Sequence, residues 1–379
     1  MNKIRFGVIG CGGMGQNHIK WINELECAKL AAVCDCDEVL VKNISNQYKV
    51  KGFNNYKDLI ESGLVDAILI VTPHYLHPII GIDAFRKGIH VLSEKPITVT
   101  VSEADKFLNA AKKSGKVFGV MYQSRTLPAI RVAREIIESG KLGEIRRTLM
   151  IDTMYRSQAY YDSAYWRGTW IDEGGGVLVN QAPHGIDLFI LLGGLPKYIT
   201  AKIRTRLHKI EVEDEAEVFL EYKNGVHGYY YTTTCELPTT TRIEICCDKG
   251  KLIYNNGELK LWTFTPSISE HNKTNTEMWA SPDVKEECLQ LPQVQTGHKE
   301  IIRNFCAHIL TGEPLISPGE HGLWTVEFFN AVILSSKTNR TVEIPVDRKE
   351  YDKLLENLKK GSKKKQINRD KHISDPKFK

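Results

Sequence analysis

Short apolar runs alternate with helical patterns over the first third of the chain. Strand-length apolar runs are expected at 4–9, 30–34, 65–71, 88–93 and 117–121, with helical patterns at 14–22, 38–47, 78–87 and 101–114. Strands that alternate with helices form a parallel sheet covered on both faces. The pattern therefore predicts an α/β protein whose residues 1–122 form a doubly wound, Rossmann-type domain.

Beyond residue 143 the pattern changes to short strands that follow one another directly. We expect strands at 145–154, 198–207, 216–222, 226–235, 241–247, 251–254 and 259–264, and an edge strand at 342–346. Asn-Gly pairs at 224–225 and 256–257 are typical of tight antiparallel turns. Residues 123–346 are therefore predicted to form an α/β domain with a large, open, mostly antiparallel sheet. A helix at 348–359 and a basic, disordered tail would complete residues 347–379.

A glycine-rich turn joins the first predicted strand to the first helix. It reads Gly10-Cys11-Gly12-Gly13-Met14-Gly15. Such a turn lets the backbone approach a pyrophosphate, which the N–H groups of the following helix can bind. The second strand ends at Asp35, whose carboxylate can accept the adenine ribose hydroxyls. No Arg is nearby to bind a 2′-phosphate, so the sequence favours NAD over NADP.

Further polar residues follow the other strands of the first domain. Ligands of open parallel sheets bind beyond the carboxyl ends of the strands. We therefore expect cofactor contacts from Thr72, Pro73, His77, Glu94 and Gln123, and we expect Lys95 to lie over the nicotinamide. The residues alone leave two alternatives equally open: His77 packed against the sheet, and Glu94 and Lys95 as a surface ion pair.

The second domain contains a polar and aromatic loop followed by three glycines, residues 174–176. A helix starting around Gly176 would place Asn180, His184 and Asp187 on one face, where they could hold a polyol and move a proton. His298, which opens a late helix, is expected to close the pocket. The candidate substrate-binding residues are Tyr122, Arg156, Tyr160, Asp162, Trp166, Asn180 and His298, and Trp166 and Arg167 are also predicted to contact the cofactor.

Composition and charge limit the classes of protein that this chain can represent. Hydrophobic residues make up 42% and charged residues 26%, as in soluble globular proteins. A strand at residue 4 leaves no room for a signal peptide, and no apolar run is long enough to cross a bilayer, so we expect a cytoplasmic protein without membrane contact. The nine cysteines lack zinc-binding spacing, and we predict reduced thiols and no metal site.

The net charge of +5 comes from the end of the chain. Residues 359–379 contain nine Lys or Arg and two Asp, a net charge of +7, which leaves −2 for the remainder. A basic run without interleaved aromatic residues is more typical of a solvated tail than of a nucleic-acid site. We therefore expect no nucleic-acid partner.

The glycine turn, Glu94-Lys95-Pro96, and the three glycines followed by Asn180 and His184 together resemble the glucose-fructose oxidoreductase and inositol dehydrogenase (Gfo/Idh/MocA) family. The resemblance runs from residue 3 to about residue 346. It implies a sugar or cyclitol held over the nicotinamide, and an open sheet that commonly packs against another subunit. The segment 160–170, with residues 180–184, looks like a branch that acts on pyranoses and glycosides, such as levoglucosan dehydrogenase and glycoside C3 dehydrogenases.

The same resemblance implies roles for individual residues. Lys95 matches the family lysine that binds the reacting hydroxyl, and His184 matches the catalytic histidine. Many members have Asp four residues before this histidine, whereas this chain has Asn180, which cannot accept a proton. Asn180 is therefore expected to orient the substrate by hydrogen bonds only.

These features lead to one main hypothesis and two alternatives. A homo-oligomer would oxidise a secondary hydroxyl, at C3, of a sugar, glycoside or cyclitol, with His184 as base and the Lys95 ammonium stabilising the alkoxide. Desolvation of Lys95 could exchange the two roles. The first alternative is a hydrolase or lyase in which tightly held NAD oxidises the sugar only transiently. The second is a non-catalytic regulator that senses a ligand, against which the joint presence of Lys95 and His184 argues.

Overall fold

The computed structural model describes residues 3–363 and 365, and its first six strands form one parallel sheet. The strand order is β3-β2-β1-β4-β5-β6, so the order reverses between β1 and β4. The carboxyl ends on either side of this switch point form the usual ligand crevice of a doubly wound sheet. The strands are β1 (Ile4–Ile9), β2 (Ala28–Cys34), β3 (Lys51–Phe53), β4 (Ala67–Ile70), β5 (His90–Ser93) and β6 (Phe118–Val120). The Rossmann prediction is confirmed, although the short β3 was not expected.

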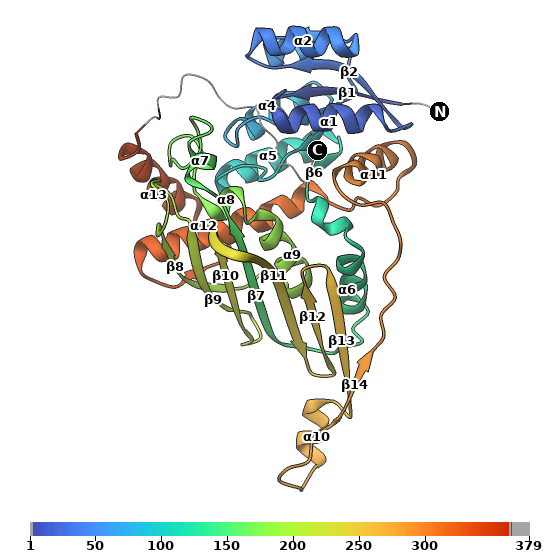
Figure 1. Ribbon diagram of the computed structural model, residues 1–379, viewed down its shortest axis with the longest axis vertical. Coiled ribbons are helices and arrows are strands. Elements are labelled where there is room, and N and C mark those ends of the chain that lie inside the picture. Colours follow the sequence, from blue (N-terminus) through green and yellow to red (C-terminus); the bar gives the residue numbers. More distant parts are fainter. Residues whose placement is uncertain (1–2, 364, 366–379) are drawn as a thin grey trace.

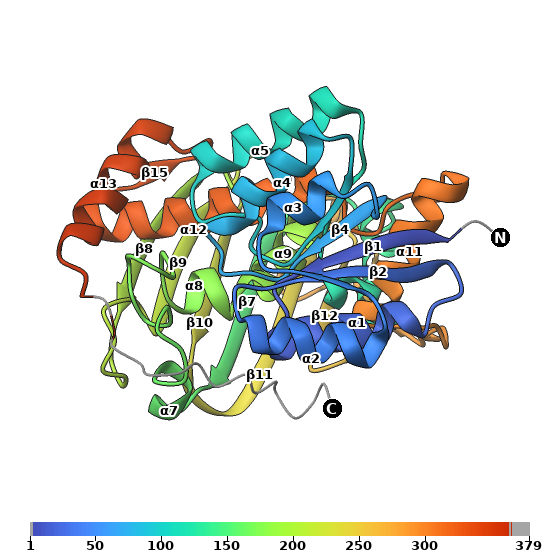
Figure 2. The same ribbon diagram turned by 90° about the horizontal axis from the view of Figure 1, so that it is seen from above.

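Helices cover both faces of this sheet (Figure 2). They are α1 (Gly13–Asn23), α2 (Glu38–Tyr48), α3 (Tyr56–Glu61), α4 (Leu76–Arg86) and α5 (Val101–Ser114). The side chains of Asp37 and Thr100 cap α2 and α5 by accepting from Leu40 N and Glu103 N. All four residues of β4 are buried, which explains its uniformly apolar sequence.

Nine strands form the second sheet, which lies below the first in Figure 1. Their order is β14-β13-β12-β11-β7-β10-β9-β8-β15, and all described pairs are antiparallel except β7 with β10. The strands are β7 (Ile145–Tyr155), β8 (Tyr198–Arg204), β9 (Glu215–Glu221), β10 (His227–Thr233), β11 (Cys235–Cys247), β12 (Gly250–Asn255), β13 (Glu258–Thr265), β14 (Asp283–Glu287) and β15 (Val342–Glu343). The predicted large, mostly antiparallel sheet is confirmed.

One face of the second sheet is covered and the other is exposed. Helices α9 (Pro183–Gly193) and α12 (Gly319–Thr338) pack on the covered face, where Val218 and Tyr230 are buried. On the opposite face Phe219 is 58% exposed and its ring lies 5.5 Å from that of Tyr229. The alternation of buried and exposed residues along β9 fits a sheet open on one side.

One late segment was not predicted by the sequence pattern, and one predicted helix, which opens at His298, packs in an unexpected place. Helix α10 (Ile268–Thr274) and β14 extend the sheet at the end far from the first domain (Figure 1). Helix α11 (His298–Thr311) packs against α1, and its Ile302 and Phe305 share a core with Phe6 and Ile19. A helix from the last third of the chain therefore completes the first domain, and the division at residue 122 stays a prediction.

The remaining helices connect the two sheets or follow them. They are the 3-10 helix η1 (Gln123–Thr126), α6 (Pro128–Glu138), α7 (Gln158–Tyr161), α8 (Val177–Asn180) and α13 (Arg348–Lys360). The expected terminal helix is thus present, whereas the predicted disordered tail lies, apart from residues 361–363 and 365, outside the described residues. In the part of the chain that the structure describes, every helix is too short or too polar to cross a bilayer.

A buried ion pair fixes the junction of the two domains. Arg125 of η1 donates to Asp187 of α9 at 2.8 and 2.5 Å, and both side chains are 1% exposed. Arg125 also donates to the Ile316 carbonyl at 3.2 Å. Since an unpaired buried charge is very costly, each partner requires the other.

We expect Asp187→Asn to lower the free energy of unfolding by about 3–5 kcal/mol, because it leaves a buried guanidinium without its counter-charge. Urea denaturation followed by circular dichroism measures this loss. Asp66→Asn is the matched control, because its pair with Arg5 is 36% and 46% exposed and should contribute less than about 1 kcal/mol. Equal losses in the two variants would contradict the interpretation.

Candidate functional site

The glycine turn between β1 and α1 has no room for side chains at two positions. Gly10 has φ +95°, and a Cβ there would lie 2.5 Å from the Val71 carbonyl oxygen. A Cβ on Gly15 would lie 2.0 Å from the Gly10 carbonyl oxygen. Helix α1 begins at Gly13, and its N-cap, Gly12, has no side chain to occupy the first N–H groups. These groups can therefore receive a phosphate, as the motif predicts.

Asp35 and Thr72 flank this turn. Asp35 follows β2, and its carboxylate accepts from the backbone N–H of Cys11 at 2.7 Å and of Asp37 at 3.1 Å. The buried Thr72 hydroxyl, which precedes Pro73 beyond β4, has no hydrogen-bond partner among the described residues. The glycine turn, the Asp35 carboxylate and the unpaired Thr72 hydroxyl together fit a dinucleotide that binds across the switch point of the sheet.

Glu94 carries a fixed negative charge beside this crevice. Burial alone would raise its pKa, but a 2.7 Å hydrogen bond to His18 and nearby positive charges lower it to about 2. His298 stacks on Trp21 of α1 at 4.7 Å and lies 5.5 Å from the His18 ring. His298 thus packs on α1 of the first domain, and its contact with the substrate pocket stays a prediction.

His77 is fully buried between two strand ends. Its Nδ1 lies 2.8 Å from the Pro96 carbonyl oxygen and its Nε2 lies 2.7 Å from that of Thr72. Both ring nitrogens are thus engaged by the backbone. The predicted cofactor contact of His77 is wrong, and the packing alternative is correct.

Lys95 connects the first domain to the second. Its Nζ donates to the Asn180 carbonyl at 2.7 Å. Burial lowers the pKa of Lys95 to about 8, with Arg167 and Arg156 adding to the decrease and Glu94 and Glu173 opposing it. The alternative of a surface ion pair does not describe the structure, because Lys95 Nζ bonds the Asn180 carbonyl and Glu94 bonds His18.

His184 lies at the start of α9, across the junction from Gln123. The Nε2 atoms of the two side chains are 3.2 Å apart. The expected single helix from Gly176 is wrong, because α8 ends at Asn180 and α9 begins at Pro183. Proline cannot donate a backbone hydrogen bond and favours the first turn of a new helix. Asp187 consequently faces Arg125 in the core instead of sharing a face with Asn180.

The Tyr122 side chain supports His184 from inside the protein. It is completely buried, its hydroxyl pairs with Thr325 at 2.6 Å, and its ring lies 6.3 Å from the His184 ring. A hydroxyl already paired in the core cannot reach a ligand. The predicted substrate contact of Tyr122 is therefore wrong.

The Tyr160 hydroxyl joins the polar loop to the residues after the three glycines. It accepts from Gln181 Nε2 at 3.0 Å, from Asn180 Nδ2 at 3.4 Å and from Arg167. The Arg167 guanidinium also lies 4.4 Å from the Trp166 ring, and that of Arg156 lies 5.3 Å from the Tyr160 ring. This cluster offers aromatic faces and donors next to Lys95, as the sequence predicts.

Two further loop residues differ in their placement. Trp166 lies 5.5 Å from the ring of His74, which follows β4, so the loop reaches the cofactor side. Asp162 is exposed and accepts from Gln158 Nε2 at 3.0 Å. Its contacts lie within the loop itself, so the structure does not support the predicted substrate contact of Asp162.

Glu173 is a site residue that the sequence interpretation missed. It is completely buried, and its oxygens accept from Asn180 Nδ2 at 2.6 Å and from Gly168 N at 2.5 Å. Burial raises its pKa to about 7, against the opposing charge of Arg167 and these hydrogen bonds. An acidic residue directly before three glycines was the available signal.

Among the described residues one trio has donors suited to a metal: His208, Asp214 and Cys235. His208 Nδ1 lies 2.9 Å from Asp214, and Nε2 lies 2.7 Å from the Arg156 carbonyl oxygen. Both nitrogens are therefore already engaged. The ring links the Asp214 carboxylate to the backbone carbonyl of Arg156, which is a structural role.

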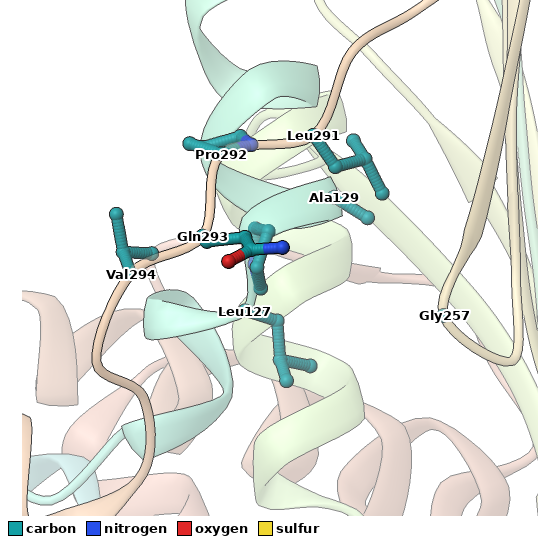
Figure 3. A pocket seen from close by; sticks show the side chains of 8 residues that line it. Leu127, Ala129, Gly257, Leu291, Pro292, Gln293 and Val294 are labelled. Atoms are coloured by element: carbon teal, nitrogen blue, oxygen red, sulfur yellow. The ribbon is translucent and has the colours of Figure 1, made fainter.

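A separate apolar cavity of about 540 Å³ contains none of these residues. Figure 3 shows its lining, which comes from the start of α6 and from residues 291–294. Its side chains include no titratable group, so it offers no redox or acid–base chemistry.

We expect Asp35→Ala to weaken NAD binding about 10- to 100-fold, since hydrogen bonds to a charged group contribute about 1.5–3 kcal/mol. The same change should narrow the preference for NAD over NADP, because it removes the repulsion of a 2′-phosphate. Titration calorimetry with both cofactors measures this. The control is Asp37→Ala, which removes the cap of α2 and should cost stability while cofactor selectivity stays intact. Unchanged selectivity in Asp35→Ala would contradict the assignment.

Comparisons with known proteins agree with this geometry. Residues 4–122 match the oxidoreductase family with an NAD-binding Rossmann fold, which confirms the predicted cofactor, and residues 130–253 match the GFO/IDH/MocA C-terminal domain. The rhizopine catabolism protein MocA of Rhizobium meliloti is 29% identical over 194 residues, which are 51% of this chain and 58% of MocA.

Solved structures show the same arrangement over most of the chain. The WlbA dehydrogenase of Bordetella pertussis, in complex with NADH and UDP-GlcNAcA, has a TM-score of 0.79 and 26% identity, covering 91% of this chain and 100% of that one. Levoglucosan dehydrogenase in complex with NADH has a TM-score of 0.77 and 20% identity, covering 91% and 100%, and shows the shared fold. Because both family matches occur in the order that the motifs predict, this chain belongs to the GFO/IDH/MocA family of NAD-binding oxidoreductases.

Proposed function

We propose that this oxidoreductase oxidises a secondary hydroxyl of a sugar, glycoside or cyclitol. The observation that carries the proposal is the contact of Lys95 with the Asn180 carbonyl, four residues before His184. The Lys95 amine of the first domain thus contacts the segment of the second domain that carries the His184 imidazole. Bound NAD⁺ would supply the hydride acceptor, and the protein has to manage the hydroxyl proton and the developing negative charge.

His184 is suited to take that proton. Its Nε2 lies 3.2 Å from the Gln123 amide nitrogen, so a polar side chain holds the imidazole at the junction of the two domains. A neutral imidazole carries one basic ring nitrogen. Lys95, with a pKa of about 8, is mostly ammonium at neutral pH and can donate to the alkoxide. The Lys95 ammonium thus suits oxidation near neutrality, and a neutral His184 imidazole would complete the acid–base pair.

The loop around Tyr160 would hold the sugar. Aromatic faces pack against the C–H groups of a pyranose, and the guanidinium groups of Arg156 and Arg167 can donate to its hydroxyls. WlbA and levoglucosan dehydrogenase, whose structures contain the same fold, act as dehydrogenases. The resemblance to glycoside C3 dehydrogenases supports C3 as the carbon that is oxidised.

We expect Lys95→Ala and His184→Ala each to lower kcat about 10²- to 10⁴-fold, the range lost with a general acid or base, while NAD binding survives. A screen of monosaccharides and glycosides, read by the absorbance of the reduced cofactor, provides the assay. Lys87→Ala, which removes a lysine that is 52% exposed on the same domain, is the control.

Normal turnover in either variant would refute the proposed roles. Cleavage of a glycoside without net formation of reduced cofactor would instead show the closed redox cycle of a hydrolase or lyase.

We also propose that copies of the chain associate in the cytoplasm through the exposed face of the second sheet. Phe219 and Tyr229 form an aromatic pair there, and Leu237 on β11 is 65% exposed. An exposed aromatic pair on an uncovered sheet face is a candidate interaction site. The nine cysteines are all free thiols, which suits a reducing compartment.

We expect Phe219→Glu to dissociate the oligomer at micromolar concentration, because it would bury a charge without a partner in the interface. Light scattering coupled to size-exclusion chromatography gives the molar mass. Val39→Glu, on the exposed surface of α2, serves as the control and should leave the mass unchanged. A wild-type mass equal to that of one chain would disprove the proposed assembly.

A further inference from the structure

We propose that Glu173 is a positioning residue for Lys95 and supplies, from a different place in the chain, the negative charge that many family members carry at the position of Asn180. The inference rests on the proposed function to the extent that Lys95 is taken to act on the substrate. It concerns a residue outside both the glycine turn and the Lys95–His184 pair.

Asn180 forms a bridge between Glu173 and Lys95. Its side-chain amide donates to the Glu173 carboxylate at 2.6 Å, and its backbone carbonyl accepts from Lys95 Nζ at 2.7 Å. Glu173 is completely buried, and its second oxygen is held by Gly168 N at 2.5 Å. The carboxylate therefore fixes the residue that in turn fixes the amine.

This arrangement explains why an amide can stand at position 180. An aspartate there would face the carboxylate of Glu173, and two adjacent carboxylates cannot both ionise without a large penalty. An asparagine instead donates to Glu173 and keeps one negative charge in the cluster. The carboxylate that is missing at position 180 is thus replaced by that of Glu173, seven residues earlier.

Glu173 is one of several charged groups that shift the pKa of Lys95. The groups that act on Lys95 are Glu94 and Glu173, which favour the ammonium, and Arg156 and Arg167, which oppose it. The rings of His74 and His77 also lie within its electrostatic reach. Glu94 is fully ionised and bonded to His18, so it supplies a constant charge. Glu173, with a pKa of about 7, supplies a charge that depends on pH.

The environment of Glu173 itself contains few charges. Arg167 favours its ionised form and Glu213 disfavours it. The buried Tyr161 hydroxyl also interacts with its charge. As the pH rises through 7, Glu173 therefore gains a negative charge that holds the proton on Lys95 more firmly.

The experiment measures the ionisation of Lys95 directly. The rate at which acetic anhydride modifies Lys95 is followed against pH by peptide mass spectrometry, since only the neutral amine reacts. Glu173→Gln keeps the size of the side chain and an oxygen for the Asn180 amide but removes the charge. We expect the midpoint of Lys95 modification to move to lower pH by at least about half a unit.

The pH profile of kcat gives a second readout on a sugar that the enzyme oxidises. If the Lys95 ammonium is required, activity falls as that proton is lost, and in Glu173→Gln this alkaline limb should move to lower pH by the same amount. Glu173→Asp, which keeps the charge, should leave the limb close to its wild-type position. The double variant Glu173→Gln with Asn180→Asp, which returns a carboxylate to position 180, should restore it.

Glu213→Gln is the matched control. Glu213 is also completely buried with a pKa of about 7, but it accepts from Gly176 N and Leu178 N and is absent from the charges that act on Lys95. Glu213 can reach Lys95 through Glu173, whose ionised form it disfavours, but Glu173 is already mostly ionised at the pH where Lys95 titrates. We therefore expect Glu213→Gln to leave the Lys95 midpoint close to its wild-type value, whatever its effect on stability.

The outcomes separate this inference from the proposed function. A Glu173→Gln enzyme that loses activity while both the midpoint and the limb stay in place would overturn the inference and leave Glu173 a purely structural residue. If no sugar is oxidised by the wild type, the proposed function fails, and the modification profile still decides the role of Glu173. If Glu173→Gln does not fold, the wild-type profile decides: coupling to a group that ionises near 7 must broaden the Lys95 curve, and a single-site curve overturns the inference.

Discussion

The junction of the two domains buries charged side chains, and the structure depends on each of them finding a hydrogen-bonding partner there. Lys95 loses hydration there and finds the Asn180 carbonyl at 2.7 Å, while Arg125 finds Asp187. A buried charge without a partner would cost several kcal/mol. These contacts therefore specify how the domains meet, and the relative position of Lys95 and the His184 segment follows from them.

Burial has opposite consequences for two glutamates at this junction. Loss of solvent would raise the pKa of both, but Glu94 has a hydrogen bond from His18 and lies near positive charges, and its pKa falls to about 2. Glu173 is held by neutral amides, and its pKa rises to about 7. One carboxylate is thus a constant charge and the other a titrating one. The two residues differ in their partners and also in exposure, because the Glu94 side chain is 12% exposed and Glu173 is completely buried.

The sequence predicted the parts of the fold that depend on local pattern. Apolar runs predicted β1 and β4, and the glycine turn predicted the start of α1. A side chain at Gly10 or Gly15 would collide with a backbone carbonyl, so glycine is required at both positions. The break before Pro183 was missed because helical spacing was followed through a proline. The roles of Glu173 and α11 were missed because both depend on contacts between distant segments, which periodicity does not report.

The Tyr160 hydroxyl connects the residues before His184 to the loop proposed to hold the sugar. It accepts from Asn180, Gln181 and Arg167, so the loop and the residues before His184 share one hydrogen-bonding centre. His208 in turn holds the backbone of Arg156 through its carbonyl. Asn180 in turn carries the acceptor of Lys95. The loop, Asn180 and the Lys95 amine are therefore joined by consecutive hydrogen bonds, because no separate element lies between them.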